Sequence, residues 1–233
     1  MKVFYNYLKY QNIIEENPFN QLRFQFRTEK VLPKTIPYDI LKSIFIYLEQ
    51  KVIVSKTDYQ KQHAERNLLI ISLLLSTGIR ISELCHIHLK DINLSNKTLH
   101  IIGKGKKERI LFLGDQKTFN LLETYINKTR NESNDFLFPG KYSLKPLSEQ
   151  SVRLAIKRIV EQNNFSRTIT PHMFRHSFAT MLLDSDVDIR YIQQILGHSS
   201  ISITQIYTHV SHSKQKEILS SFNPVSAIHS EIE

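Results

Sequence analysis

The sequence predicts a mainly α-helical protein with a small β-hairpin or sheet. An apolar stripe at helical spacing over residues 40–48 and an almost unbroken apolar run over residues 68–75 both favour helices, the second of them buried. The period then changes, because residues 98–102 and 109–113 are short β-prone runs. Glycines in the segment 103–108 between these runs predict a turn with a basic tip.

The first third of the chain contains a linker between helical segments. Residues 2–10 carry apolar side chains at helical spacing, and Pro33 and Pro37 mark the linker. A helix is expected from Pro37. The next helix, over residues 62–76, is expected to end at Gly78, because glycine readily adopts the left-handed conformation that ends helices.

The rest of the sequence predicts a series of helices before and after the hairpin. They are expected at 81–87, 115–130 and 149–162, from Pro171 to about 183, from Asp186 or Asp188 to Gly197, and at 201–208 and 213–221. Ser148 and Thr170 are the expected N-cap residues of the two helices that follow them. In the tail, the near-helical spacing of Val225, Ile228 and Ile232 predicts a docking segment.

Composition bounds the class of protein. The chain has 233 residues, enough for one good core with a small appendage. Its single cysteine, Cys85, excludes an internal disulfide and a thiolate zinc cluster. No apolar run reaches the roughly 18 residues of a membrane span, and the N-terminus lacks the pattern of a signal peptide. We therefore expect a cytoplasmic protein with no membrane association.

The positive charge is unevenly distributed. The formal net charge is +9, and residues 100–175 carry 14 Lys and Arg against 7 Asp and Glu, whereas residues 176–233 carry 3 against 6. A basic middle with a mildly acidic end indicates a directed anionic partner, most often nucleic acid. A solvated basic face is the alternative interpretation.

The most informative stretch is T-P-H-M-F-R-H-S-F-A-T, residues 170–180. It reads as a helix start, and His172, Arg175 and His176 follow at i, i+3 and i+4, so that all three project from one face. Cations beside the free N–H groups of a helix N-terminus can hold an anion such as a phosphate. A surface helix with Arg and His by chance is the alternative.

Two further features carry charge at defined places. In T-G-I-R-I-S-E-L, a helix end fixes Arg80 at a rigid junction, and Glu83 one turn later could hold its guanidinium by a charge-assisted fork; a purely structural ion pair is the alternative. The hairpin tip could reach a phosphate or donate a proton, or could be a soluble turn. Its cations are Lys104, Lys106, Lys107 and Arg109.

The order of these features resembles that of a known family. Two more residues follow along the chain, His198 in G-H-S-S and Tyr207 in I-T-Q-I-Y-T-H-V. Taken alone, His198 could donate to a phosphate oxygen or be a turn residue, and Tyr207 could be an ordinary amphipathic core or surface residue. The order of the motifs is Arg80, a lysine hairpin, His-x-x-Arg, His and then Tyr. This order is similar to the active-site pattern of the tyrosine recombinase (phage integrase) superfamily, and the motifs themselves resemble those of its Xer members. The resemblance covers the chain from about Pro37 to the end. Its most specific pieces are T-G-I-R-I-S-E-L, G-K-G-K-K-E-R, H-M-F-R-H-S-F-A-T, L-G-H-S-S and I-Y-T-H.

The resemblance implies the chemistry of phosphoryl transfer to a tyrosine. Arg80, Arg175 and His198 match the family residues that stabilise charge on the non-bridging phosphate oxygens. Tyr207 matches the nucleophile, which forms a 3′-phosphotyrosyl link to DNA. His172 matches the residue that assists by proton transfer.

The remaining roles concern the leaving group and the surroundings of the site. Lys104 matches the general acid that protonates the departing 5′-hydroxyl, and Lys106 is the competing candidate. His176 is expected to buttress the site, and Glu83 to orient Arg80. The resemblance implies no cofactor, and we expect no metal, because no acidic cluster with metal-ligand spacing stands out.

The resemblance also implies a domain organisation. Residues 35–233 are expected to form a tyrosine-recombinase-like catalytic domain, with the tail 213–233 as a candidate for docking on a neighbouring protomer. Residues 1–34 resemble the end of an N-terminal core-binding domain and its linker, with most of that domain absent from this chain. We therefore expect weak binding to the DNA site.

The function implied is site-specific recombination or integration, as for a mobile element. The expected partner is double-stranded DNA, bound by a homotetramer on paired sites, with a monomer expected in the absence of DNA. A type IB topoisomerase-like enzyme is the alternative enzyme class, and a DNA-binding protein that has lost catalysis is the alternative from outside enzymes. Integration, excision and dimer resolution stay open.

Overall fold

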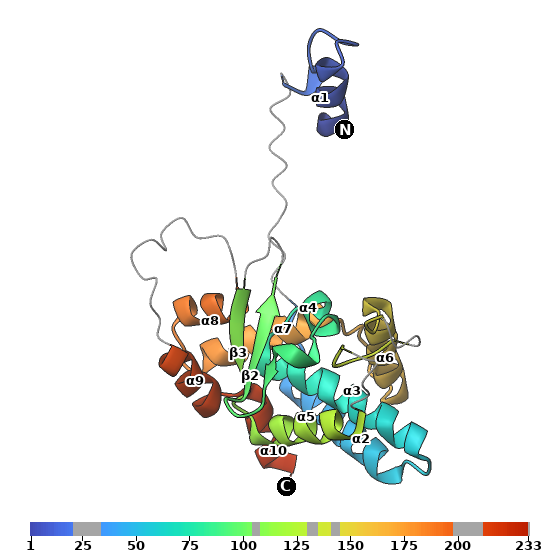
Figure 1. Cartoon of the computed structure of the whole chain (residues 1–233), viewed down its shortest axis with the longest axis vertical. Helices are drawn as coiled ribbons and strands as arrows, with labels where there is room; N and C mark the ends of the chain where they lie inside the picture. Colours follow the sequence, from blue (N-terminus) through green and yellow to red (C-terminus); the bar gives the residue numbers. More distant parts are fainter. Residues whose placement is uncertain (21–33, 104–107, 130–134, 141–144, 198–211, 233) are drawn as a thin grey trace. The chain divides into compact units, whose positions relative to one another are not determined.

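The computed structural model describes residues 1–20, 34–103, 108–129, 135–140, 145–197 and 212–232, without the side chains of residues 212–215. The chain divides into two compact units, Met1–Leu32 and Pro33–Glu233. Helices dominate the second unit, which also contains one small sheet, so the predicted fold class is confirmed (Figure 1). None of the described helices is both long and apolar enough to cross a membrane.

The first unit is a helix and a short turn joined by one buried side chain. Helix α1 (Lys2–Tyr10) is followed by a 3₁₀ turn at Pro18–Asn20. The side-chain amide of Asn17 donates to Oδ1 of Asn6 at 2.6 Å, and its own Oδ1 accepts from the backbone N–H of Phe19 at 2.9 Å. These bonds satisfy the buried amide and hold the turn on the helix.

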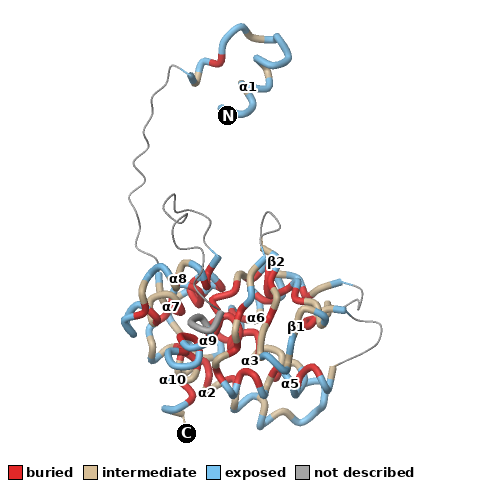
Figure 2. Tube along the Cα trace, turned by 60° about the vertical axis from the view of Figure 1, so that its left-hand side comes forward, coloured by how far each residue is buried: buried red, intermediate tan, exposed pale blue. Residues whose placement is uncertain are grey.

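The second unit is arranged around one central helix. Its elements are α2 (Tyr38–Val54), α3 (Asp58–Thr77), α4 (Ile81–Cys85), a 3₁₀ turn (Leu89–Asp91), β1 (Ile92–Asn93), β2 (Thr98–Ile102), β3 (Glu108–Phe112), α5 (Gln116–Thr129), α6 (Glu149–Gln162), α7 (Pro171–Asp184), α8 (Ile189–Leu196), α9 (His212–Ser221) and α10 (Pro224–Ile232). Helix α3 contacts α2, α5, α7 and α10, and the buried segments gather in the interior around it (Figure 2).

Helix α3 is buried on all sides over its second half. Every residue from Leu69 to Thr77 is buried, which explains why the sequence shows no polar face there. The helix ends at Gly78, whose φ of 61° is left-handed, as predicted. A Cβ at Gly78 would lie 2.5 Å from Cδ1 of Phe178, so glycine also allows α7 to pack closely. This end of α3 positions the site described below.

Within the described residues the small sheet has three strands, one more than the predicted hairpin pair. β2 and β3 pair antiparallel with Leu99 opposite Leu111, in the two regions where strands were predicted. The third strand, β1, adds Ile92 opposite Leu99. A strand of two residues is too short to show alternation, so no sequence pattern predicts it.

Most predicted helix ends are present. The Ser148 side chain accepts from the N–H of Ser151, and the Asp188 side chain accepts from the N–H of Arg190, so both residues cap their helices. Thr170 occupies the N-cap position of α7, but its side chain makes no capping bond. The helix expected at 201–208 lies outside the described residues.

The tail packs on its own chain. Val225 and Ile228, two of the three residues predicted to dock on a neighbour, are fully buried in the core, and Ile232 packs against it. A Cβ at Gly114, just after β3, would lie 1.9 Å from the carbonyl oxygen of Leu219 in α9, so only glycine permits this approach. In this structure the proposed docking face is therefore occupied within the chain, because α10 covers apolar surface of the central helices.

A buried carboxylate fixes α10 to the start of α5. Asp115 accepts from the hydroxyl of Ser226 at 2.7 Å and from the N–H of Thr118 at 2.7 Å, and Nδ1 of His229 lies 3.4 Å from its Oδ2. Burial alone would raise the pKa of Asp115, but these contacts, with His229 first, outweigh it and lower the pKa to about 2. The ionised form is thus strongly favoured in the folded protein.

Replacing Asp115 with Asn should lower the free energy of unfolding by about 2 kcal/mol at pH 7, because a carboxyl with a lowered pKa stabilises the folded state once it is ionised. The wild-type protein should lose this contribution as the pH falls from about 4 to about 2, and the variant should show a flatter dependence. Urea unfolding at several pH values measures both effects.

The exposed ion pair between Lys42 and Glu231, which also joins α10 to α2, provides the control. Glu231→Gln should leave the unfolding free energy nearly unchanged, because exposed ion pairs contribute little to stability. Equal stabilities of Asp115→Asn and the wild-type protein at pH 7 would contradict the role given to Asp115.

Candidate active site

Arg80 lies at a tight junction between two helices. α3 ends at Thr77, Gly78 turns the chain, and Arg80 is the N-cap residue of α4. The hydroxyl of Thr77 donates to the carbonyl of Leu73 at 2.6 Å and accepts from the N–H of Ile79 at 3.3 Å. The backbone before Arg80 is therefore fixed, which limits the directions that its side chain can take.

Glu83 holds Arg80 at two points. The backbone N–H of Arg80 donates to Oε2 of Glu83 and its Nη1 donates to Oε1, both at 3.0 Å. The carboxylate is buried, whereas about a third of the Arg80 side chain is exposed. The predicted contact between the two residues is present, but it is a single side-chain bond plus a backbone bond rather than a fork.

The fork is made instead by Arg109, whose bond to Glu83 the sequence interpretation missed. Nη1 of Arg109 donates to Oε1 of Glu83 at 2.9 Å, and Nη2 donates to Oε2 at 2.7 Å. Arg109 therefore does not act as one more cation of the hairpin tip. Strand alternation was the available signal, because Arg109 shares a face with buried Leu111 and pairs with buried Ile101.

Arg175 joins the ends of two helices. It is 7% exposed, and its Nη1 donates to the carbonyl of Gly78 at 2.6 Å, while Nη2 donates to the carbonyl of Leu196 at 2.7 Å. These carbonyls lie at the C-terminal ends of α3 and α8, where a cation is favoured by the helix dipole. Arg175 thus holds the two helix ends together.

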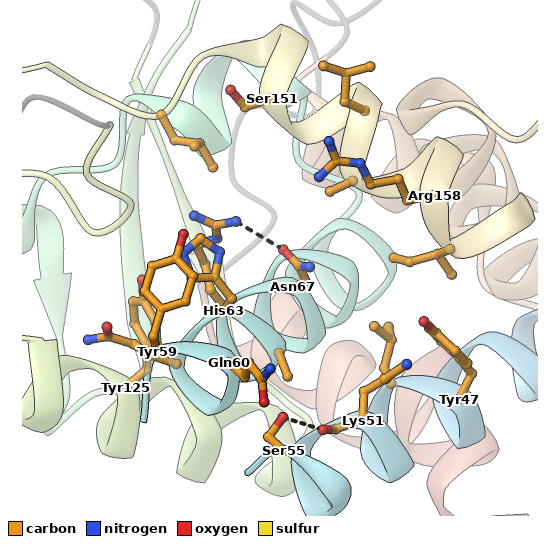
Figure 3. Close-up of a pocket in the computed structure, with 18 of the residues that line it drawn as sticks. Tyr47, Lys51, Ser55, Tyr59, Gln60, His63, Asn67, Tyr125, Ser151 and Arg158 are labelled. Atoms are coloured by element: carbon orange, nitrogen blue, oxygen red, sulfur yellow. Dashed lines mark hydrogen bonds between the residues drawn. The ribbon is translucent and has the colours of Figure 1, made fainter. Parts of the chain in front are cut away.

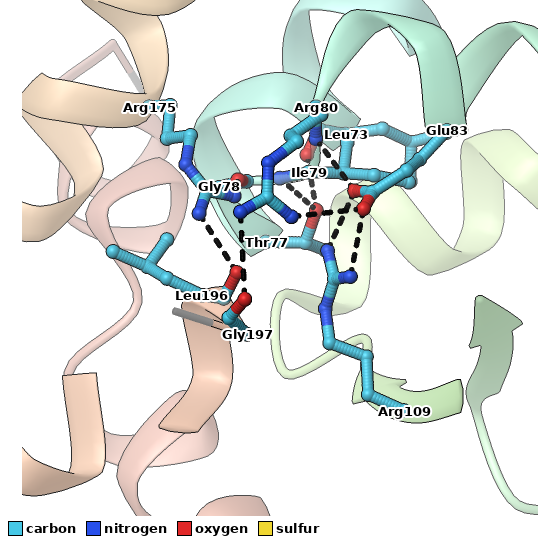
Figure 4. Close-up of polar contacts among 10 residues, drawn as sticks. All are labelled: Leu73, Thr77, Gly78, Ile79, Arg80, Glu83, Arg109, Arg175, Leu196 and Gly197. Atoms are coloured by element: carbon cyan, nitrogen blue, oxygen red, sulfur yellow. Dashed lines mark hydrogen bonds and ion pairs between the residues drawn. The ribbon is translucent and has the colours of Figure 1, made fainter. Parts of the chain in front are cut away.

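The two arginines converge on the same place. Nη2 of Arg80 lies 3.4 Å from the carbonyl oxygen of Gly197, next to the carbonyl that Arg175 binds. Figure 4 shows both guanidinium groups directed toward Leu196 and Gly197, with Glu83 and Arg109 on the other side of Arg80. Residues that are 95 positions apart in the sequence therefore form one cationic cluster.

The cluster has more positive than negative charge. It contains the guanidinium groups of Arg80, Arg109 and Arg175, and the one carboxylate bonded to them among the described residues is Glu83. Burial alone would raise the pKa of Glu83, but the bonds and charge of Arg109, followed by those of Arg80, lower it to about 2. Burial, and then the charges of Arg80 and Arg109, lower the pKa of Arg175 to about 10, so it stays charged at neutral pH. Such a cluster can bind an anion.

The two histidines of α7 lie at the protein surface. His172 and His176 are both exposed one turn apart, whereas Arg175 beside them is buried, so the three residues differ in their access to solvent. Burial, followed by the positive charges of His172 and Arg175, lowers the pKa of His176. The neutral form of His176 is therefore favoured, and a neutral imidazole can both donate and accept a hydrogen bond.

Five of the residues named in the sequence analysis lie outside the described part of the chain. They are Lys104, Lys106, Lys107, His198 and Tyr207. The described chain comes close to the lysines and to His198, since β3 begins at Glu108 and α8 ends at Leu196, followed by Gly197. Arg109 and Gly197, each close in sequence to a predicted catalytic residue, belong to the cluster.

A large cavity of the second unit lies away from this cluster. It has a volume of about 1090 Å³ and lies among α2, α3, α5 and α6, with Tyr59, His63 and Arg158 in its lining (Figure 3). None of the described candidate residues lines it. Among the described residues, no group of three His, Cys, Asp or Glu side chains is placed to hold a metal ion.

Comparison with known proteins assigns the family. The phage integrase family pattern matches residues 47–214. The chain belongs to the phage integrase family of tyrosine recombinases. It is 50% identical over 232 residues to a tyrosine recombinase of Agathobacter rectalis, covering 98% of this chain and 75% of that protein. It is 36% identical over 208 residues to the tyrosine recombinase XerD of Staphylococcus haemolyticus, covering 87% of this chain and 70% of that protein.

Solved structures agree with this assignment. The XerA recombinase matches with a TM-score of 0.61 and 28% identity, over 92% of this chain and 72% of that one. The XerH recombinase bound to its difH substrate matches with a TM-score of 0.65 and 26% identity, over 93% and 61%. The Tn1549 transposon integrase in complex with DNA has 22% identity at a TM-score of 0.62, over 93% and 74%, and supports the fold alone. The family resemblance seen in the sequence is confirmed.

Replacing Glu83 with Gln should lower the free energy of unfolding by about 3 kcal/mol at pH 7, because it leaves like-charged guanidinium groups together without their carboxylate. The contribution of Glu83 should be complete above about pH 4.5 and be lost as the pH falls toward 2, since its pKa is lowered in the folded state. Urea unfolding measures both.

A matched control is Glu149→Gln, which breaks an exposed pair with Arg153 one turn away on α6. That variant should lose no more than about 0.5 kcal/mol. If Glu83→Gln were no less stable than this control, the cluster would not depend on its carboxylate.

Proposed function

We propose that this chain is a site-specific DNA recombinase that cleaves and rejoins DNA through a covalent 3′-phosphotyrosyl link to Tyr207. The observation that carries the proposal is the convergence of Arg80 and Arg175 beside the end of α8, with an excess of positive charge. A phosphodiester under attack gains charge on its non-bridging oxygens, and fixed donors directed at them lower the barrier. Two guanidinium groups at one place are suited to stabilising that charge.

In the proposed site, Arg80, Arg175 and His198 contact the scissile phosphate. Loss of one such donor costs an enzyme about 3 kcal/mol of transition-state stabilisation, going by oxyanion holes. Each guanidinium has five N–H groups, so the carbonyl contacts of Arg175 and Arg80 leave donors for a phosphate. The electrostatic contribution needs no metal ion.

The proposed reaction conserves the energy of the broken bond. The Tyr207 oxygen forms a bond to phosphorus as the bond to the 5′-oxygen breaks. A phenol with an ordinary pKa of about 10 needs help to attack at neutral pH, and His172 takes its proton. Lys104, or Lys106 in its place, gives a proton to the leaving 5′-oxygen. Religation reverses these steps, so ATP is not required.

Double-stranded DNA is the proposed partner. The chain carries a net charge of +9, and α6 presents the exposed cations Arg153, Lys157 and Arg158. The XerH relative is described as bound to its difH substrate, which agrees with this partner. Phosphate contacts make such binding depend steeply on salt. We assign a further part of the DNA clamp to residues 1–34, as the sequence predicts.

Four copies on two paired duplexes are the proposed active assembly. Strand exchange between two sites requires two cleavages on each duplex, and each copy supplies one nucleophile in the proposed mechanism. Docking of the tail on a neighbour would require α10 to leave the core and the contacts of Asp115 with Ser226 and His229. The assembly therefore competes with the packing of α10 in the single chain.

A suicide substrate tests the function. A duplex nicked close to the cleavage point loses the short 5′-hydroxyl fragment, so a cleaved complex cannot religate and the covalent adduct accumulates. We expect an adduct on a denaturing gel with the wild-type chain and none with Tyr207→Phe, which differs by one oxygen atom. DNA binding by the two proteins at the same salt is the control and should agree.

Other outcomes favour the alternatives. An adduct with relaxation of supercoiled plasmid, but no exchange between two sites, would favour a type IB topoisomerase-like enzyme. Binding without an adduct in either protein would indicate a DNA-binding protein without catalysis. An adduct retained by Tyr207→Phe would place the nucleophile elsewhere.

A modified substrate tests which lysine is the general acid. With sulfur in place of the 5′-oxygen at the scissile bond, the leaving group is a thiolate, which departs without a proton. Lys104→Ala should slow cleavage of the ordinary substrate by about 10²–10⁴-fold. The same variant should cleave the sulfur-containing substrate at nearly the wild-type rate. Lys106→Ala should have little effect on the rate at which either substrate is cleaved.

The control for this experiment is Arg80→Ala, which removes a phosphate donor and should stay slow on both substrates. Sulfur rescue of Lys106→Ala instead of Lys104→Ala would assign the acid to Lys106. Rescue of neither variant would exclude proton donation by this hairpin.

A further inference from the structure

The carboxylate of Glu83 is shared between two arginines from different elements. Oε1 accepts from Nη1 of Arg80 and Nη1 of Arg109, and Oε2 accepts from the backbone N–H of Arg80 and Nη2 of Arg109. The shortest of these four bonds, 2.7 Å, comes from Arg109. The carboxylate is thus fixed by Arg109 and holds Arg80.

Arg109 also lies close to the second partner of Arg80. A Cβ added at Gly197 would lie 3.1 Å from Cδ of Arg109, so the stem of this side chain runs along the Gly197 backbone. The carbonyl of Gly197 is the group that faces Nη2 of Arg80. Arg109 therefore hydrogen-bonds one of the two groups that hold the Arg80 guanidinium and lies close to the other.

We propose that Arg109 is a positioning residue for DNA cleavage, which fixes Glu83 and through it the Arg80 guanidinium. The inference rests on the proposed function, in which Arg80 contacts the scissile phosphate. Arg109 itself touches no reacting atom in this proposal.

The local structure shows why Arg80 needs this support. Glu83 lies on α4, a helix of five residues, and the Arg80 side chain is about one third exposed. A single Glu–Arg pair at such a place can exchange with water. Arg109 is anchored in β3 opposite Ile101, and its side chain is 13% exposed, so it gives the carboxylate a rigid partner.

The test measures cleavage and binding separately. Single-turnover cleavage of the nicked suicide duplex at saturating protein gives the rate constant, and a titration at the same salt gives Kd. Arg109→Met should slow cleavage by about 10–100-fold, because small displacements of catalytic groups have effects of this size. Its Kd should stay within about 3-fold of the wild-type value, because one partly buried charge is lost from a large phosphate-binding surface.

Arg109→Lys separates position from charge. Lysine keeps the positive charge but cannot make the fork, so its cleavage rate should lie closer to that of Arg109→Met than to the wild-type rate. A wild-type rate in Arg109→Lys would overturn the positioning role and leave only a contribution of charge. Arg190→Met is the matched control, since Arg190 of α8 makes an exposed fork with the N-cap residue Asp188. This variant should cleave at the wild-type rate.

A double variant tests whether Arg109 acts through Glu83. If it does, Arg109→Met combined with Glu83→Gln should cleave no more slowly than Glu83→Gln alone. Multiplicative losses would overturn the inference, because Arg109 would then act independently. Circular dichroism and the urea midpoint show which variants are folded, and Arg109→Lys carries the test if Arg109→Met is not.

Failure of this inference is distinguishable from failure of the proposed function. Absence of an adduct with the wild-type chain would reject the function. A wild-type adduct formed equally fast by Arg109→Met would reject only the role of Arg109.

Discussion

The candidate site depends on one buried carboxylate. Three guanidinium groups, those of Arg80, Arg109 and Arg175, lie near one another, and their mutual repulsion is offset by Glu83 alone among the described residues. Because one negative charge faces three positive ones, the cluster keeps a positive excess. That excess is what an anionic ligand would use, so the same interaction stabilises the fold and prepares the site.

The helices supply the other half of the site through their C-terminal ends. Gly78 and Gly197 end α3 and α8 in the left-handed conformation, and the carbonyls released there accept from Arg175 and Arg80. These carbonyls would otherwise lack intrahelical partners. The close approach of α7 at Gly78 brings Arg175 within reach of both helix ends. Backbone geometry therefore aligns the two guanidinium groups.

The tail completes the core around the central helix α3, because α10 contacts α2, α3, α5 and α7. Val225 and Ile228 are fully buried, and Asp115 binds Ser226 of the same helix. The approach of α9 to Gly114 leaves no room for a side chain there. A tail that is bonded and buried in this way belongs to the folded unit, and any exchange between chains has to replace these contacts.

The order of the motifs is a property of the sequence itself. Local signals in the sequence also determined the helix ends and the contact between Arg80 and Glu83, because caps and contacts between residues three apart depend on backbone geometry within one turn. Tertiary structure alone decided that Arg109 forms the fork with Glu83, that Arg175 binds the ends of two helices, and that Val225 faces the chain's own core. Each of these joins groups far apart in the sequence. Hydrophobic burial and strand register bring such groups together, and neither leaves a local pattern that names the partner.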